Sequence, residues 1–119
     1  MPALETVGDY LKESRRLLQD EYEPYRYPTV DIVDALNIGL TEARRLRADL
    51  FLPNFELPYV DTSGTINTST KVPMDPMYRS SLVYYAVGRM QLRDDEPTTD
   101  QRAGGLLQKF VQQMLVIAS

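Results

Sequence analysis

The chain has 119 residues, which is the length of one domain with one modest core. With 13 basic and 17 acidic residues its net charge is −4, so a general nucleic-acid binder is not expected. Cysteine and histidine are both absent, which excludes a disulfide framework, thiol chemistry and the commonest general base and metal ligand.

No targeting or membrane segment is predicted. The first residues lack a basic region followed by an apolar run, so a secretory signal is not expected. No apolar run approaches the roughly 20 residues that span a bilayer. We therefore expect a soluble protein, made in a cytoplasm, with no membrane contact.

The first predicted helix covers residues 6–20. Thr6 to Asp9 resembles a capping box, in which Thr6 and Asp9 each accept from the other's backbone amide. Apolar residues at helical spacing predict the buried side; they are Leu4, Val7, Leu11 and Leu18. The charged residues are expected to lie mostly on the opposite side; they are Lys12, Glu13, Arg15 and Arg16.

A loop rich in tyrosine follows, because Pro24 and Pro28 interrupt any continuous helix. Tyr22, Tyr25 and Tyr27 fall within six residues of one another. They are candidates for a contact with a neighbouring subunit or a partner. The alternative is a loop packed over the core, and the sequence leaves both interpretations open.

The second predicted helix covers residues 29–50 and has one clear apolar stripe, formed by Ile32, Val33, Leu36, Leu40, Ala43 and Leu50. Arg44, Arg45 and Arg47 lie mostly off that stripe. They predict a solvated face in which Arg45 pairs with Asp49, or else a contact with an acidic partner or with DNA phosphate.

Residues 54–73 change to an alternating pattern, which predicts a β-hairpin or an extended arm. Six of the nine residues from Thr62 to Thr70 are Ser or Thr, so the tip has little to bury and is expected to be mobile. The candidate contact residues of this arm are Tyr59, Thr62, Ser63, Gly64, Thr65 and Ile66.

The central predicted helix covers residues 76–93. Asp75 and Pro76 form a helix start signal, and no residue between Arg79 and Arg89 is charged. A helix that is apolar nearly all round is buried nearly all round. We expect one subunit to be unable to cover it, which suggests an assembly.

The last predicted helix covers residues 99–117, after an acidic turn that contains Asp94, Asp95 and Glu96. Gly104–Gly105 costs this helix about 2 kcal/mol relative to two alanines, so we expect another backbone to approach there. The chain end is unusually apolar. Its candidate interface residues are Met114, Leu115, Val116 and Ile117.

No catalytic constellation is present in the sequence. Gly104–Gly105 lacks the Lys-Ser/Thr pair of a phosphate loop. The acidic turn, with Asp100, could hold a hard cation, but the helix dipole alone favours acidic residues at a helix start. A helix-turn-helix reader of DNA does not fit, because a long arm separates the two central helices. We predict no enzymatic activity, no cofactor and no metal.

The pattern predicts a mainly α fold with a single domain at residues 1–119. It is a four-helix bundle with an inserted β-hairpin or extended arm between the second and third long helices.

Several stretches, taken in order, resemble one family, the head-to-tail adaptor (connector) proteins of tailed bacteriophages. They cover most of the chain except the tip of the arm and the last residues. They are Thr6–Asp9, Arg16–Asp20, Tyr25–Tyr27, Asp34–Leu40, Arg44–Phe51, Met74–Tyr78, Leu82–Tyr85, Gly88–Arg89 and Leu92–Glu96.

The resemblance implies a helical bundle with an inserted arm, assembled as a twelvefold ring beneath the portal. Such a ring lies in the neck of the virion, extends the DNA channel and docks the tail. The implied partners are copies of the chain, the portal protein and a tail or nozzle protein, with assembly in the cytoplasm of a bacterial host. The family has no catalytic residue to transfer.

The negative charge agrees with a channel through which DNA passes without sequence-specific binding, because acidic walls repel phosphate. Asp94, Asp95 and Glu96 are the candidate residues of the channel lumen. Some adaptors have a long C-terminal extension for the portal, whereas little follows the last helix here, so the family's portal contact is not transferred.

Two other functions remain as alternatives. One is a small helical module that binds a partner or regulates it, which the size of the oligomer and co-purification with a portal would distinguish. The other is a carboxylate-based cell-wall hydrolase, which a turbidity assay on cell walls would reveal.

Overall fold

A computed structural model describes residues 4–51, 65–72, 76–92 and 97–115, together with residues 60, 62 and 74. The fold is mainly helical, as predicted, and a helical bundle fits it. Its elements are α1 (Val7–Leu18), α2 (Thr29–Leu46), η1 (Ala48–Phe51), η2 (Pro76–Tyr78), α3 (Arg79–Gln91) and α4 (Pro97–Met114), where η denotes a short 3₁₀ turn.

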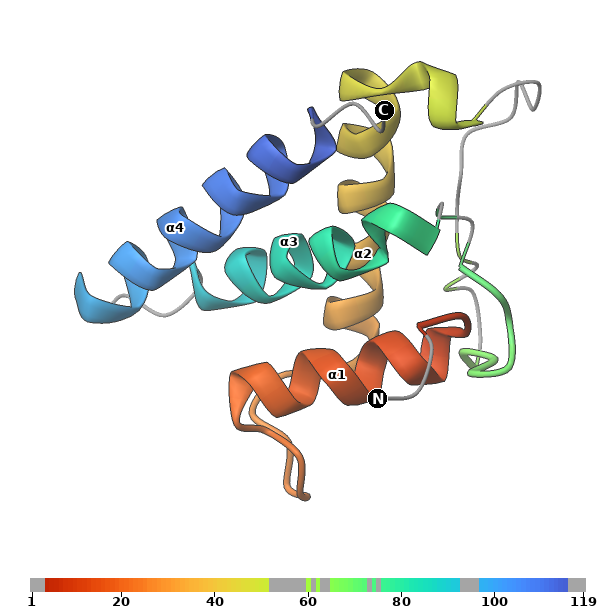
Figure 1. The fold of residues 1–119 in the computed structure, drawn as a ribbon. Coiled ribbons are helices and arrows are strands. Elements are labelled where there is room, and N and C mark those ends of the chain that lie inside the picture. The colour runs from red at the N-terminus through yellow and green to blue at the C-terminus, as the bar shows by residue number, and fades with distance from the viewer. Residues whose placement is uncertain are drawn as a thin grey trace.

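The central helix, α3, packs against all three other helices. In Figure 1, α1 runs below α3, α2 passes behind both, and α4 lies above α3. The buried residues of α3 come from every side of the helix; they are Ser81, Leu82, Val83, Tyr85, Ala86, Val87, Gly88, Met90 and Gln91. One chain therefore covers this helix, and the expectation that a neighbouring subunit is needed to bury it is wrong.

The N-terminus of α1 is capped as the sequence predicts. The Thr6 hydroxyl accepts from the Asp9 amide at 3.2 Å, and the Asp9 carboxylate accepts from the Thr6 amide at 3.0 Å. The amides of Thr6 and Glu5 donate to this carboxylate and lower the pKa of Asp9 below its ordinary value.

The returning part of the predicted arm completes the same helix end. The free amides of Val7 and Gly8 donate to the carbonyls of Thr70 and Thr68, at 2.8 and 2.9 Å. An unpaired helix terminus is costly, so these bonds hold the segment against α1. Within the segment that was expected to be mobile, Thr68 and Thr70 are therefore anchored on α1.

The structure does not support the predicted β-hairpin. Among the described residues no strand is present, and the only bridge is an isolated antiparallel one between Thr6 and Lys71. The described residues from Thr68 to Val72 bind the N-terminal end of α1 through backbone hydrogen bonds. The predicted first strand, with Phe55 and Tyr59, lies outside the described residues.

The second helix ends earlier than predicted, at Leu46 instead of residue 50. Arg47 leaves the helical conformation with φ −139°, and η1 follows. This break changes the ion pairs. Arg45 pairs with Glu42 at 2.8 Å, whereas Asp49 pairs with Arg47 at 2.8 Å, so the predicted Arg45–Asp49 pair is wrong.

The other two helices also differ from prediction at their ends. The first turn of the third predicted helix is the 3₁₀ turn η2, and the N-cap of α3 is Tyr78, which makes no side-chain capping bond. Asp75, the predicted cap, lies outside the described residues. α4 begins at Pro97 and ends at Met114.

Close helix packing occurs at a glycine that the sequence did not single out. A Cβ on Gly39 would lie 2.7 Å from Leu82 Cδ1 and 2.9 Å from Tyr85 Cδ1, so only glycine lets α2 approach α3 this closely. A Cβ on Gly104 or Gly105 would meet nothing within 4 Å. Within one chain, the predicted backbone approach at Gly104–Gly105 is wrong.

The different surroundings of Gly39 and Gly104 predict opposite effects of substitution by alanine on the free energy of unfolding. Gly104→Ala should raise the free energy of unfolding by about 1 kcal/mol, because alanine is the better helix former and meets no obstacle. Gly39→Ala should lower it by about 1–3 kcal/mol, because its methyl group overpacks the α2–α3 contact. Urea denaturation of both variants tests this, and equal effects would contradict the packing described.

The capping carboxylate predicts the acid sensitivity of the fold. The pKa of Asp9 is lowered on folding, so its stabilisation is present above the unfolded pKa and is lost as pH falls. Without histidine, the free energy of unfolding should be nearly constant from about pH 6 to 8 and fall below about pH 4. Asp9→Asn should be less stable at neutral pH and show a shallower acid decline. If the stability of Asp9→Asn declined in acid as steeply as that of the wild type, other carboxylates would be the cause of the decline.

Candidate functional site

A buried ion pair fixes the loop between α1 and α2. Arg15 Nη1 donates to Asp20 Oδ2 at 2.9 Å and to the Tyr27 carbonyl at 3.0 Å, and Nη2 donates to the Thr29 hydroxyl at 2.9 Å. Asp20 also accepts from the backbone amides of Arg26 and Tyr27, at 2.8 and 3.0 Å. Both charged side chains are buried, so each depends on the other for compensation.

The three candidate tyrosines of this loop differ in their exposure and in their contacts. Tyr27 is buried in the chain's own core and is not available to a partner. The Tyr25 ring lies 3.7 Å from the Arg15 guanidinium carbon and is partly exposed. Tyr22 is 86% exposed, the largest value among the large hydrophobic side chains described. The loop thus has a packed end and an outward tip.

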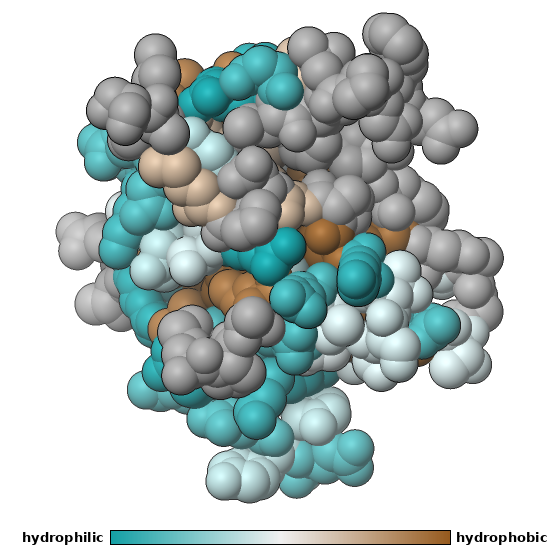
Figure 2. Space-filling view, turned by 45° about the vertical axis from the view of Figure 1, so that its right-hand side comes forward, coloured by the Kyte–Doolittle hydropathy of each residue, from teal (hydrophilic) through white to brown (hydrophobic). Residues whose placement is uncertain are grey.

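The loop projects from the body of the molecule. In Figure 1 it extends below α1, away from the other helices. Figure 2 shows the same projection at the bottom of the molecule, and most of the described surface in that view is hydrophilic or neutral. An exposed aromatic side chain on a projecting, fixed loop is typical of a contact residue.

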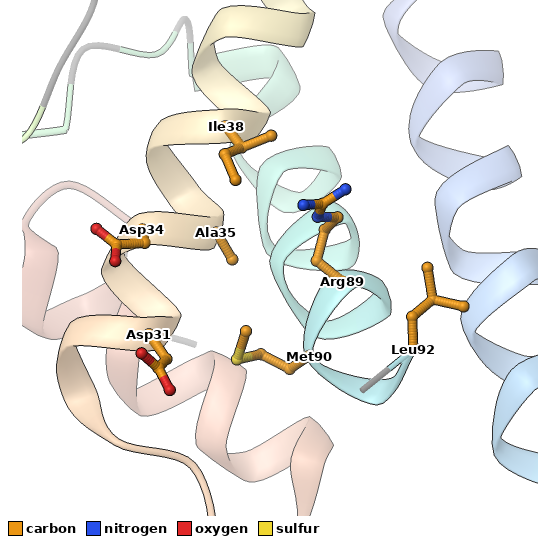
Figure 3. A pocket seen from close by; sticks show the side chains of 7 residues that line it. All are labelled: Asp31, Asp34, Ala35, Ile38, Arg89, Met90 and Leu92. Carbon is orange, nitrogen blue, oxygen red and sulfur yellow. The ribbon is translucent and has the colours of Figure 1, made fainter. Parts of the chain in front are cut away.

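A groove of about 350 Å³ lies between α2 and the C-terminal end of α3. Figure 3 shows Ala35 and Ile38 of α2 and Met90 of α3 pointing into the space between the two helices. Its lining residues are Asp31, Asp34, Ala35, Ile38, Arg89, Met90 and Leu92. The sequence analysis did not identify this groove, because it depends on how two helices cross.

The groove has an apolar floor and charged edges. Ala35 and Met90 are buried, whereas Ile38 and Leu92 are 39% and 44% exposed. Asp34 comes from α2 and Arg89 from α3 (Figure 3). Such a surface suits a protein side chain or helix better than a soluble metabolite, because it is open and has few polar groups.

A second arginine, the half-buried Arg47, holds the C-terminal end of α4. Arg47 Nη1 donates to the Met114 carbonyl at 2.9 Å and to the Tyr78 hydroxyl at 3.2 Å. Its other nitrogens bind both oxygens of Asp49, which lowers the pKa of that carboxyl. A free carbonyl at a helix C-terminus favours a cation, so Arg47 joins α2, η2 and α4.

The residues of the predicted interface at the chain end have different environments in the structure. Met114 is fully buried in the core, so it is a structural residue of this chain and not an available contact. Leu115 is 54% exposed. Val116 and Ile117 lie outside the described residues.

The remaining candidates are only partly placed. In the arm, Thr65 is exposed, Thr62 is half-buried, and Ile66 is half-buried and packed against the core. The other arm candidates, Tyr59, Ser63 and Gly64, lie outside the described residues. The lumen candidates Asp94, Asp95 and Glu96 lie outside them as well.

In the described part of the chain, acidic side chains form no group of three or more that could hold a metal ion. Among its helices none is long and apolar enough to cross a membrane.

Comparisons with protein-family models, curated proteins and solved structures find no match to this chain. Its function must therefore be inferred from its own residues and surfaces.

The two structural arginines were missed, although a signal was present. Arg15 follows Leu11 by four residues and precedes Leu18 by three, so it falls on the apolar stripe of α1. Arg47 follows Ala43 by four residues and continues the stripe of α2 in the same way. A cation on an apolar stripe indicates burial with a partner, but the partner itself cannot be identified from the spacing.

Removing the carboxylate of the buried ion pair should destabilise the fold. Asp20→Asn leaves the Arg15 charge buried without compensation, which costs about 3–5 kcal/mol. The control is Glu42→Gln in the exposed Arg45–Glu42 pair, which should change the free energy of unfolding by at most about 1 kcal/mol. Denaturant unfolding measures both, with tryptic cleavage after Arg26 reporting release of the loop. An Asp20→Asn variant as stable as the control would show that the ion pair does not hold the loop.

Proposed function

We propose that this chain is a head-to-tail adaptor of a tailed bacteriophage. Copies form a ring, twelvefold by the resemblance, beneath the portal in the neck of the virion. The ring extends the DNA channel, docks the tail or nozzle protein and performs no catalysis. DNA passes through it without sequence-specific binding, and a net charge of −4 per chain favours free passage.

The observation that supports the proposal best is that the stretches resembling this family contact one another. Asp20 of one stretch accepts from the Tyr27 amide of another. Arg47 donates to the hydroxyl of Tyr78, which belongs to a stretch about thirty residues away along the chain. Stretches that are weak signals singly therefore pack against one another within one chain.

The surfaces agree with a subunit that has several neighbours. Tyr22 on the projecting loop, Leu92 at the groove and Leu115 at the end of α4 are exposed apolar side chains on different elements. A ring subunit between a portal and a tail needs contacts on several sides, whereas a small enzyme needs one cavity with converging polar groups. Asp94, Asp95 and Glu96 would line the channel in this assembly.

The exposed end of α4 provides the test. Leu115→Asp should leave a folded, helical chain, because the side chain is more than half exposed, and should prevent its incorporation into particles, because a docking contact becomes charged. Circular dichroism of the free variant and mass spectrometry of purified virions measure the two effects. We expect the free wild-type chain to be monomeric or weakly associated and to form its ring on the portal.

Two variants of the same helix serve as controls. Gln112→Asp changes an exposed polar residue and should enter particles normally. Met114→Asp changes a fully buried one and should unfold the chain. Normal incorporation of Leu115→Asp would remove the end of α4 as a docking element. Absence of the wild-type chain from particles would remove the adaptor function and favour a helical module that binds another partner.

A further inference from the structure

We propose that the hollow between α1 and the projecting loop binds a small organic anion, in which a phosphate or carboxylate group is joined to an aromatic ring. The hollow has a volume of about 460 Å³, which is within the range of ligand pockets. Its lining comes from α1, from the loop, from Thr29 at the start of α2 and from Thr68 of the arm. The inference goes beyond the proposed function and concerns binding alone.

Arg15 is the buried group of the hollow that points to an anion. It lines the hollow and is only 7% exposed. Its guanidinium donates to Asp20, to the Tyr27 carbonyl and to Thr29, and its other N–H groups have no acceptor in the described part of the chain. Asp20 offsets the charge of Arg15, so the preference for an anion comes from these unused donors. A buried donor without an acceptor is costly, and a bound oxyanion would remove that cost.

The positive end of α2 lies at the same hollow. Thr29 is the first residue of α2 and lines the hollow, while the N-cap residue, Pro28, provides no side-chain capping bond. The first amides of a helix without such a cap are free to bind an anion, and the helix dipole favours negative charge there. The helix end and the unused donors of Arg15 therefore favour the same kind of ligand.

Lys12 adds an exposed cation to the lining, three residues before Arg15 on α1. The acidic residue of the lining is Glu21. Its charge acts on Arg16, outside the lining, whose pKa is raised first by a hydrogen bond to Glu13 and also by the charge of Glu21. Lys12 is therefore available to pair with the ligand.

The apolar part of the lining favours an anion that also contains a ring. Leu11 is buried, and the Tyr25 ring lies 3.7 Å from the guanidinium carbon of Arg15. Tyr22 belongs to the same lining and is 86% exposed, so a ligand ring placed against it would cover apolar surface that is open to water. Aromatic rings also attract one another in offset or edge-to-face arrangements.

Titration of the whole chain with phenyl phosphate tests the proposal, with nitrogen–proton NMR spectra as the measurement. We expect saturable binding with a Kd of about 1 mM or tighter. The signals that shift should be the amides of Gly8 and Thr29 and the Nε–H group of Arg15. Phenol and inorganic phosphate each contain one part of the probe, and each should bind at least roughly tenfold more weakly.

Two variants identify the contributions of the charge and of the ring. Lys12→Gln should weaken the binding of phenyl phosphate roughly tenfold, because a charge-assisted hydrogen bond is lost. Its matched control is Lys109→Gln, which removes the same charge from α4, outside the lining, and should leave the Kd unchanged. Tyr22→Ala should weaken phenyl phosphate roughly threefold and leave inorganic phosphate unaffected. Circular dichroism verifies that each variant is folded.

The outcomes separate this site from the proposed function. Binding that does not saturate, shifts confined to other parts of the chain, or equal effects of Lys12→Gln and Lys109→Gln would each overturn the site. Inorganic phosphate binding as tightly as phenyl phosphate would overturn the organic class of the ligand. Specific binding by a chain that is absent from virions would establish the site and refute the adaptor function. A chain that enters virions but does not bind the probe would do the reverse.

Discussion

The burial of α3 is the constraint on which the rest of the structure depends. Its side chains are apolar on nearly every side, so the helix is stable only where other elements exclude water all around it. α1, α2 and α4 each contribute one wall, and Gly39 lets α2 approach until it touches Leu82 and Tyr85. The positions of the loop, the groove and the chain end follow from how these three helices cover one core helix.

Two arginines, the buried Arg15 and the half-buried Arg47, connect this core to the surface. Arg15 with Asp20 holds the loop between α1 and α2, and Arg47 holds the C-terminal end of α4 beside Tyr78. A buried charge without partners is expensive, so each arginine selects one arrangement of the segments around it. Taking charges out of water costs free energy, so these ion pairs are weak evidence for net stability. The same cost disfavours every arrangement in which the charges lose their partners, so the ion pairs select a single geometry. Tyr22 and Leu115, which lie next to the segments that these arginines hold, are consequently presented in defined positions.

The surface features of this fold support the proposed role in assembly. Exposed apolar side chains occur on separate elements, and the groove has an open, apolar floor with charged edges. Such features suit contacts with several protein neighbours, each of modest size. A ring subunit has this requirement by its symmetry, since a head-to-tail contact uses two unlike surfaces of every copy.

The sequence by itself determined the helical class, the four helices with ends shifted by a few residues, and the Thr6–Asp9 cap, because these depend on local spacing and on short-range hydrogen bonds. Its β-hairpin is not supported in the described part of the arm, where the carbonyls of Thr68 and Thr70 accept from the free amides of α1. Only the tertiary structure decided that one chain covers α3, that Arg15 is buried and Arg47 half-buried, that Met114 and Tyr27 are core residues, and that α2 and α3 form a groove. These outcomes depend on contacts between residues distant in the chain, and the periodicity of a single helix specifies which face is apolar but not what will cover it.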